Sequence, residues 1–288
     1  MTVLTFAPAF ITLVLAAFVG VLPPPLHPVW SARLLAIVAV TTALAVLGTA
    51  GFVGVNYLAG LDPAATAWLP EWALFGDDRP LPAVLGVPAL ALTAAGVTVA
   101  AVRSARWRRE IRAARRDART VVGTDEPVAL AVPGRDGGVL VSRGLLALLT
   151  RDELRVVFEH ERCHLRHRHH RYLAAGALSA AVLPPLRPLD RRLRFTVERW
   201  ADEAAAEAVG DRALVARTIA RVALNRAPGA LPAFAGNGVP QRVQALLSEP
   251  PGKNPVTGPV TVVSTGATTT AMASAAFQLD RAIGFILL

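Results

Sequence analysis

Two histidines and a glutamate at a fixed spacing give this chain its clearest chemical signal: His160-Glu161-Arg162-Cys163-His164. On an α-helix, residues four positions apart lie on one face, so His160 and His164 can present two imidazole nitrogens to one metal ion. Glu161 would lie beside that ion, where its carboxylate can take a proton from a water molecule. The pattern predicts zinc-assisted hydrolysis of an amide, with Glu161 as the general base.

A catalytic zinc site usually has three protein ligands and one open position, so a third ligand is needed. The candidate is Glu198, on a second predicted helix that ends near Gly210. Asp202 lies four residues further on and shares its face. We interpret Glu198 as the third ligand and Asp202 as the carboxylate that orients a ligand histidine through a hydrogen bond. The reverse assignment and Glu203 are the alternatives.

The segment before the first histidine carries the signals of a helix start. Thr150 and Glu153 form the pattern of a capping box, in which each satisfies a backbone N–H near the other. Apolar residues then recur at helical spacing at Leu154, Val157 and Phe158. We therefore expect both histidines on one face of a helix.

The composition predicts a membrane protein. Apolar residues make up 53% of the 288 residues, and the mean hydropathy is positive. Three uncharged segments, 3–22, 34–60 and 80–102, are each long enough to cross a hydrocarbon core of about 30 Å as a helix. A signal peptide is the alternative for the first segment, but no positive residue precedes its apolar run.

The charges on either side of the third segment predict its orientation. Residues 61–79 contain four acidic residues and one arginine, whereas residues 103–119 contain eight arginines. By the positive-inside rule, the arginine-rich end is cytoplasmic, and the acidic connection and the N-terminus are outside. This predicts a multi-pass protein of the cell membrane whose chemistry takes place on the cytoplasmic side.

The basic segment, residues 104–124, has two interpretations. Arginines beside a membrane span bind anionic lipid headgroups, which accounts for the charge without a further partner. Nucleic acid is the alternative for a chain with a net charge of +9, but no nucleic-acid-binding motif accompanies the run. We expect contact with the bilayer and no nucleic acid.

Together, the histidine motif and the stretch Glu198-Arg-Trp-Ala-Asp202 resemble the membrane-embedded gluzincin metallopeptidases. These include heat-shock-type membrane proteases, prenyl-protein proteases and the BlaR/MecR-type signal-transducing peptidases, the last being the nearest in layout. Residues 139–154 and 242–247 add to the resemblance, which covers about residues 125 to 250. It implies Zn²⁺ held by His160, His164 and Glu198.

The resemblance also implies a β-hairpin that takes up the substrate. Its strands would be Val128–Val132 and Val139–Ser142, and its edge would accept a peptide as an added strand. The residues independently favour a hairpin, because β-branched side chains flank a turn containing Asp136-Gly137-Gly138.

The predicted fold class is mainly α and integral to the membrane. Three or four transmembrane helices would be joined to a cytoplasmic gluzincin-like zinc protease domain with a small β-hairpin. Tyr172–Leu186 would be a helix buried against the membrane between the two ligand helices. The predicted divisions are 1–103 (three spans), 104–124 (basic segment), 125–250 (peptidase domain), 251–258 (linker) and 259–288 (a fourth span from near Pro259, with a disordered linker as the alternative).

Other polar residues receive simpler interpretations. His167, His169 and His170 are read as solvated neighbours of a basic helix end, with metal ligation as the lesser alternative. Cys163, the single cysteine, is read as a packing residue. The sequence identifies no donor for a reaction oxyanion, and Arg212 and Arg217 are candidates without further support.

The sequence thus predicts a membrane zinc endopeptidase that cleaves a protein or peptide substrate at the cytoplasmic membrane face. Cleavage of a transcriptional repressor in a signalling pathway ranks first, by resemblance. Quality control of membrane proteins is the second role. A non-catalytic scaffold of the same fold is the third. Substrate, activating signal and oligomeric state are left open.

Overall fold

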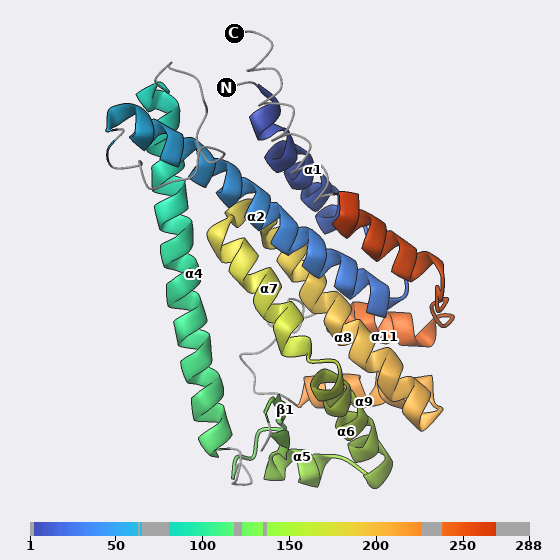
Figure 1. Cartoon of the computed structure of the whole chain (residues 1–288). Helices are drawn as coiled ribbons and strands as arrows, with labels where there is room; N and C mark the ends of the chain where they lie inside the picture. Colours follow the sequence, from blue (N-terminus) through green and yellow to red (C-terminus); the bar gives the residue numbers. More distant parts are fainter. Residues whose placement is uncertain are drawn as a thin grey trace.

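The computed structural model describes residues 3–62, 64, 81–117, 123–134, 137–225 and 238–268. Within these residues the fold is mostly helical, with one small antiparallel sheet (Figure 1). Long apolar helices occupy the upper part of this view, and shorter helices with the sheet lie below them. The predicted class, a mainly helical fold with a small hairpin, agrees with this arrangement.

Two helices form the first pair of the upper bundle. After a 3₁₀ turn, η1 (Val3–Phe6), helix α1 spans Ala7–Val21 and α2 spans Pro28–Leu61. The two run in opposite directions, side by side (Figure 1). A buried hydrogen bond from Thr42 Oγ1 to the carbonyl of Thr12, 3.0 Å long, joins them. Such a bond satisfies a hydroxyl group away from water.

Helix α4 (Ala83–Asp117) packs against α2 through small residues. A Cβ atom at Gly86 would overlap the ring of Tyr57, and one at Gly54 would come within 2.8 Å of Leu90. Glycine therefore allows the two backbones to approach closely. The helix continues without interruption from the apolar segment into the basic one.

Two helices in the described residues are long and apolar enough to cross a membrane, α2 and the part of α4 between Ala83 and Ala113. Helix α1 is apolar but has 15 residues, fewer than the predicted span 3–22. Most of the acidic connection 61–79 lies outside the described residues. Of the predicted fourth span, residues 259–268 are helical, and residues from 269 on lie outside the described part.

The hairpin consists of β1 (Ala129–Val132) and β2 (Gly138–Val141), paired antiparallel with Ala129 opposite Val141. Two helices follow, α5 (Arg143–Leu148) and α6 (Arg151–Arg166). The predicted hairpin is therefore present. Its first strand is one residue shorter than expected, and its second strand has the expected length but begins and ends one residue earlier.

A helical hairpin inserts next into the upper bundle. It consists of α7 (His169–Val182), the 3₁₀ turn η3 (Pro184–Leu186) and α8 (Arg187–Val209). Helix α7 packs between α2 and α4, and α8 packs on α1 and α2. The predicted buried helix between the two ligand helices is thus present as α7.

The buried core of the described residues consists of two clusters, and α8 contributes residues to both of them. Buried apolar residues of several helices form one cluster, which contains Val19 of α1, Leu35 of α2, and Leu193 and Val197 of α8. A second, smaller cluster joins α6, α8, α9 (Arg212–Leu224) and α11 (Val239–Leu247). Helix α8 belongs to both clusters and so connects the bundle with the smaller helices.

Candidate metal centre

The start of α6 fixes the register of its two histidines. Thr150 Oγ1 accepts a bond from the Glu153 N–H, and the Glu153 carboxylate accepts one of 2.8 Å from the Thr150 N–H, which completes the predicted capping box. His160 and His164 then lie one turn apart on the same face, with their Nε2 atoms 3.1 Å apart.

Helix α8 brings Glu198 to this pair of nitrogens. The helix is held by the buried side chains of Leu193, Val197 and Trp200. Oε2 of Glu198 lies 3.5 Å from His160 Nε2, and its Oε1 lies 3.7 Å from His164 Nε2. The three predicted ligands are therefore together, with one ligand atom of each within 4.8 Å of the others.

The three separations fit a tetrahedral ion. Zinc binds histidine nitrogen and carboxylate oxygen at about 2.0 to 2.2 Å, which places two ligand atoms about 3.3 Å apart. The observed separations, 3.1, 3.5 and 3.7 Å, lie close to that spacing. The donor set, two imidazoles and one carboxylate, is also a typical one for catalytic zinc.

Asp202 lies behind His160 and fixes the orientation of its ring. The Nδ1 atom of His160 is 3.1 Å from Oδ1 of Asp202, a carboxylate that is fully buried. A histidine whose Nδ1–H donates to a carboxylate presents Nε2 to a metal, which is the arrangement expected for an orienting residue. The geometry favours Glu198 over Asp202 as the ligand, because Glu198 faces the Nε2 atoms.

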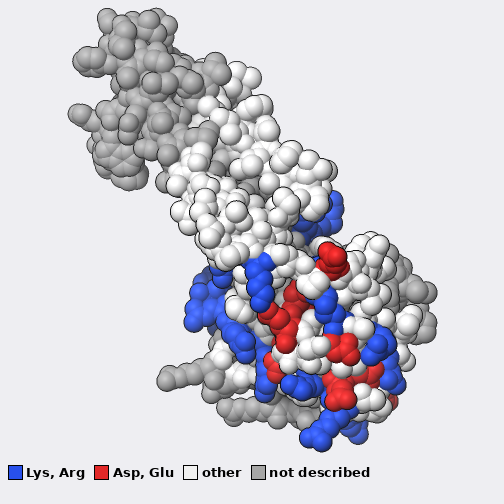
Figure 2. All heavy atoms as spheres, turned by 90° about the vertical axis from the view of Figure 1, so that its right-hand side faces the viewer, with Lys and Arg blue, Asp and Glu red and all other residues white. Residues whose placement is uncertain are grey.

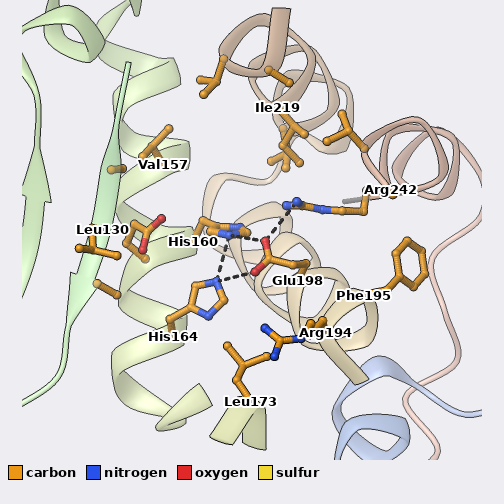
Figure 3. Close-up of a pocket in the computed structure, with 18 of the residues that line it drawn as sticks. Leu130, Val157, His160, His164, Leu173, Arg194, Phe195, Glu198, Ile219 and Arg242 are labelled. Carbon is orange, nitrogen blue, oxygen red and sulfur yellow. Dashed lines mark hydrogen bonds and ion pairs between the residues drawn. The ribbon is translucent and has the colours of Figure 1, made fainter. Parts of the chain in front are cut away.

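Arg242, from α11, completes the polar network. It donates two hydrogen bonds to Asp202, of 2.7 and 2.6 Å, and its Nη1 lies 3.1 Å from Oε2 of Glu198 (Figure 3). Arg242 and Asp202 are both buried, so the ion pair between them is shielded from water. The arginine balances the second carboxylate and holds both in place.

The electrostatics suit a bound cation. Burial alone would lower the pKa of His160, but hydrogen bonds and charges from Asp202 and Glu198 outweigh it and raise that pKa to about 10. Burial and the charge of His160 lower the pKa of His164 to about 4. In the absence of metal, a proton on His160 thus supplies the positive charge that the two carboxylates favour.

His169 is a functional candidate that the sequence interpretation placed wrongly. It is fully buried, not solvated, and its Nδ1 lies 2.9 Å from Nδ1 of His164. Its ring packs against Trp200, with a centroid separation of 4.5 Å. If His164 binds a metal through Nε2, its Nδ1–H donates to His169, which then carries its own proton on Nε2.

The other two histidines, His167 and His170, do not belong to the cluster of predicted metal ligands. His167 packs on Trp200, and His170 lines the cavity beside the metal ligands. Arg168, which precedes α7 and has a left-handed φ of 54°, turns the chain between α6 and α7 so that His169 reaches His164. The buried turn between two helices could not be read from the charge pattern, which favoured an exposed helix end.

Three further sequence candidates are placed by the structure. Glu203, the alternative ligand, is paired with Arg199 and Arg212 and does not join the metal cluster. Arg212 also donates to two backbone carbonyls of α11, and neither it nor Arg217 lines the cavity. The two arginines are therefore unsuited to an oxyanion role. Cys163 is buried, as a packing residue would be.

A cavity of about 900 Å³ opens at the ligands. His160, Glu161, His164, Glu198 and Arg242 all line it. One side is formed by α6 and by the strand β1 through residues 129–131, and the opposite side by α8 and α9 (Figure 3). The predicted general base and the predicted substrate strand thus face the same space.

The comparisons with known proteins agree with this chemistry. The model of Peptidase family M48 matches residues 101–184, less than a third of the chain. The match includes both histidines and Glu161, ends before Glu198, and supports a metallopeptidase without singling out the BlaR/MecR type. No curated protein and no solved structure matches the chain.

Proposed function

We propose that the protein is a zinc-dependent endopeptidase of the membrane. The observation that carries the proposal is the convergence of His160, His164 and Glu198 within 4.8 Å, at the wall of a cavity large enough for a peptide. The match to Peptidase family M48 supports the same reaction class. A scaffold without activity is disfavoured, because the three predicted ligands and the predicted general base line one cavity.

Each residue has a defined part in the proposed reaction. When bound, zinc would polarise a water molecule and the substrate carbonyl. Glu161 accepts the proton of the attacking water and returns it to the leaving amine. Asp202 holds His160 in the tautomer that leaves Nε2 free, and Arg242 fixes Asp202 and Glu198.

The substrate would lie beside β1 as an added strand. Leu130 and its neighbours line the cavity, and the edge of β1 opposite β2 has no strand partner in the described part of the chain. Backbone hydrogen bonds from an edge strand would hold an extended peptide across the metal ligands. An extended chain gives access to the scissile amide from one side.

The apolar helices support a position in the bilayer. Phe10, Val14 and Phe18 form an outward stripe on α1, and each is at least 53% exposed. Such exposed apolar surface is unfavourable in water and suits contact with lipid. Figure 2 shows charged side chains gathered on one half of this face, while the described part of the other half is uncharged.

The arginines of α4 support the cytoplasmic side for the metal centre. Arg103, Arg106 and Arg112 are exposed on the part of α4 that continues past the apolar segment. The same end of α4 lies beside the β-hairpin in Figure 1. We infer that these arginines contact anionic headgroups and that the N-terminus is outside.

Repressor cleavage in a signalling pathway is the role we rank first, with membrane-protein quality control second. The two differ in the substrate that accumulates uncut when cleavage is abolished. Comparative proteomics of cells carrying the wild-type protein or Glu161→Gln would identify it. Accumulation of one DNA-binding protein supports the first role, and accumulation of many damaged membrane proteins supports the second.

The catalytic proposal is tested by Glu161→Gln in the purified protein. We expect the variant to bind zinc with a stoichiometry like that of the wild type, while peptide cleavage falls at least about 100-fold, the usual contribution of a general base. Glu159→Gln is the matched control, because Glu159 lies on the same helix and pairs with Arg162. Wild-type turnover by Glu161→Gln rules out the mechanism.

A further inference from the structure

The two ends of the cavity differ in charge. Beyond the metal ligands on one side, α6 and α9 supply an apolar wall, made of Val156, Val157, Val215, Ile219 and Val222. On the other side, the first two turns of α8 supply three arginines, Arg191, Arg192 and Arg194. Figure 3 shows Ile219 and Arg194 on opposite sides of His160, His164 and Glu198.

The arginines are held in different ways. Arg192 donates to the carbonyls of Gly20 and Val21, and so supports the end of α1. Arg194 donates through Nε to Asp190, and its side chain is 50% exposed. Arg191 is exposed and forms no ion pair with another described residue. Of these three arginines, only Arg194 has a carboxylate partner in the described part of the chain.

The net positive charge is more than the fold requires. Arg192 stabilises the α1 terminus, since its guanidinium satisfies carbonyls that lack helical partners. Neither Arg191 nor Arg194 has such a role among the described residues, because Arg191 has no ion-pair partner there and the ion pair of Arg194 with Asp190 uses its Nε, while both arginines line the cavity. Guanidinium groups at the edge of a cleft suit bidentate binding of a carboxylate.

We propose that this end of the cavity is an acidic-residue subsite of the peptidase, formed by Arg191 and Arg194. The inference rests on the proposed function. The preferred substrate carries an acidic side chain on the side of the scissile bond that lies over α8, and an apolar side chain on the side that lies over α9. The two ends of the cavity thereby set the direction in which a peptide lies.

The test uses the full-length protein in a neutral detergent and a library of quenched fluorescent peptides. Each position on either side of the scissile bond is fixed in turn as Glu, Gln or Lys. We expect Glu to be preferred over Gln at one position by roughly fivefold in kcat/KM, the effect of one partly exposed ion pair, mainly through KM. Equal cleavage of the Glu and Gln peptides at every position overturns the inference.

Charge reversal locates the subsite. In Arg191→Glu and Arg194→Glu, we expect the preference at that position to change from Glu to Lys, while cleavage of peptides with Gln there is retained. Arg187→Glu is the matched control, because Arg187 lies exposed on the same helix but does not line the cavity. A preference for Glu that persists in both cavity variants overturns the inference.

Lipid headgroups are the competing ligand for these arginines. Repeating the assay in vesicles with and without an anionic lipid distinguishes binding of a substrate carboxylate from binding of lipid headgroups. If the Arg191 and Arg187 variants lose activity equally, and only with anionic lipid, the arginines bind headgroups and the inference is wrong. If no peptide is cut in a Glu161-dependent way, the proposed function itself is wrong. If peptides are cut but Glu is not preferred, only the acidic-residue subsite is wrong.

Discussion

At the scale of single residues, the metal centre consists of ligands that are each held by a second residue. His160 is fixed by Asp202, and Asp202 by Arg242. His164 is fixed by His169, whose ring is enclosed by Trp200. Such outer contacts decide the tautomer and direction of a ligand histidine before the ion arrives.

Asp202→Asn tests the first of these contacts. The amide has nearly the same shape but lacks the charge that favours an Nδ1–H on His160, so we expect zinc affinity to fall about 10- to 100-fold. Competition with a zinc chelator measures the change. Asp190→Asn serves as control, since Asp190 pairs with an arginine on the same helix away from the ligands. Equal affinity in the wild type and Asp202→Asn would contradict the orienting role.

His169→Phe tests the second contact. The ring and its packing on Trp200 are kept, but the acceptor for the His164 N–H is lost, so we again expect a decrease of about 10-fold or more in zinc affinity. His167→Phe provides the comparison, because His167 also packs on Trp200 and does not bond to His164. If both variants bind zinc alike, His169 is only a packing residue.

The sequence predicts part of this centre for physical reasons. His160 and His164 are four residues apart, which places them on one face of a helix, and the same spacing places Asp202 on the face of Glu198. Arg242 and His169 depend on how α11 docks and how the chain turns at Arg168, and neither is encoded in a local pattern. An arginine among the apolar positions of a short helix is the one signal that could have indicated Arg242.

At the scale of helices, the start of α6 controls the placement of its ligands. Glu153 caps the helix and also bonds Arg221 of α9, at 2.9 and 3.1 Å. Burial alone would raise the pKa of Glu153, but the bonds from Thr150 and Arg221 outweigh it and keep that pKa below its usual value. The capping carboxylate therefore joins the two helices that form the apolar end of the cavity.

This lowered pKa predicts how stability depends on pH. A carboxylate whose pKa is lower in the folded state stabilises the fold above its unfolded pKa, and the contribution is lost as the pH falls through the folded value. Glu153→Gln keeps the cap but not the charge, so its unfolding temperature should lie below that of the wild type at neutral pH and approach it at about pH 4 or lower. Thermal unfolding of both proteins in detergent measures the difference, and a constant gap at all pH values contradicts it.

The positions of the long helices in the sequence were more predictable than the way in which the helices pack against one another. The span 34–60 lies within α2, and the span 80–102 is largely contained in α4, because long uncharged runs specify a helix in any apolar environment. The fourth span stays a prediction, since residues 259–268 are helical and the rest of it lies outside the described residues. The insertion of the α7–α8 hairpin among α1, α2 and α4 could not be predicted, because 15 uncharged residues are compatible with several kinds of buried helix.

At the scale of the whole molecule, the helical hairpin of α7 and α8 reaches the same level along the bundle as the apolar parts of α2 and α4. A Cβ atom at Gly96 would overlap Leu47 and lie 3.3 Å from Val182, so the tip of α7 reaches residues inside two predicted spans. The charged half of the molecule in Figure 2 then begins where the apolar helices end. This arrangement is the basis for placing the cavity at the membrane surface.

The orientation is tested by single cysteines. The chain has one cysteine, Cys163, and it is buried, so the native protein provides a low background. In intact cells, a thiol reagent that does not cross membranes should label Asp62→Cys and not Arg112→Cys. Labelling of Arg112→Cys should appear after the cells are permeabilised. The opposite pattern would reverse the assigned sides.

If the protein lies in a bilayer as proposed, the shared core around α8 would make the position of the apolar helices and the geometry of the metal ligands depend on each other. One face of this helix is packed by Val19 and Leu35, and the same helix carries the carboxylate ligand. A soluble fragment lacking residues 1–103 would lose the surface against which that carboxylate is set. On the proposed function, a change in lipid thickness that tilts α1 or α2 would shift their packing on α8, and with it the position of the carboxylate ligand and the rate of peptide cleavage.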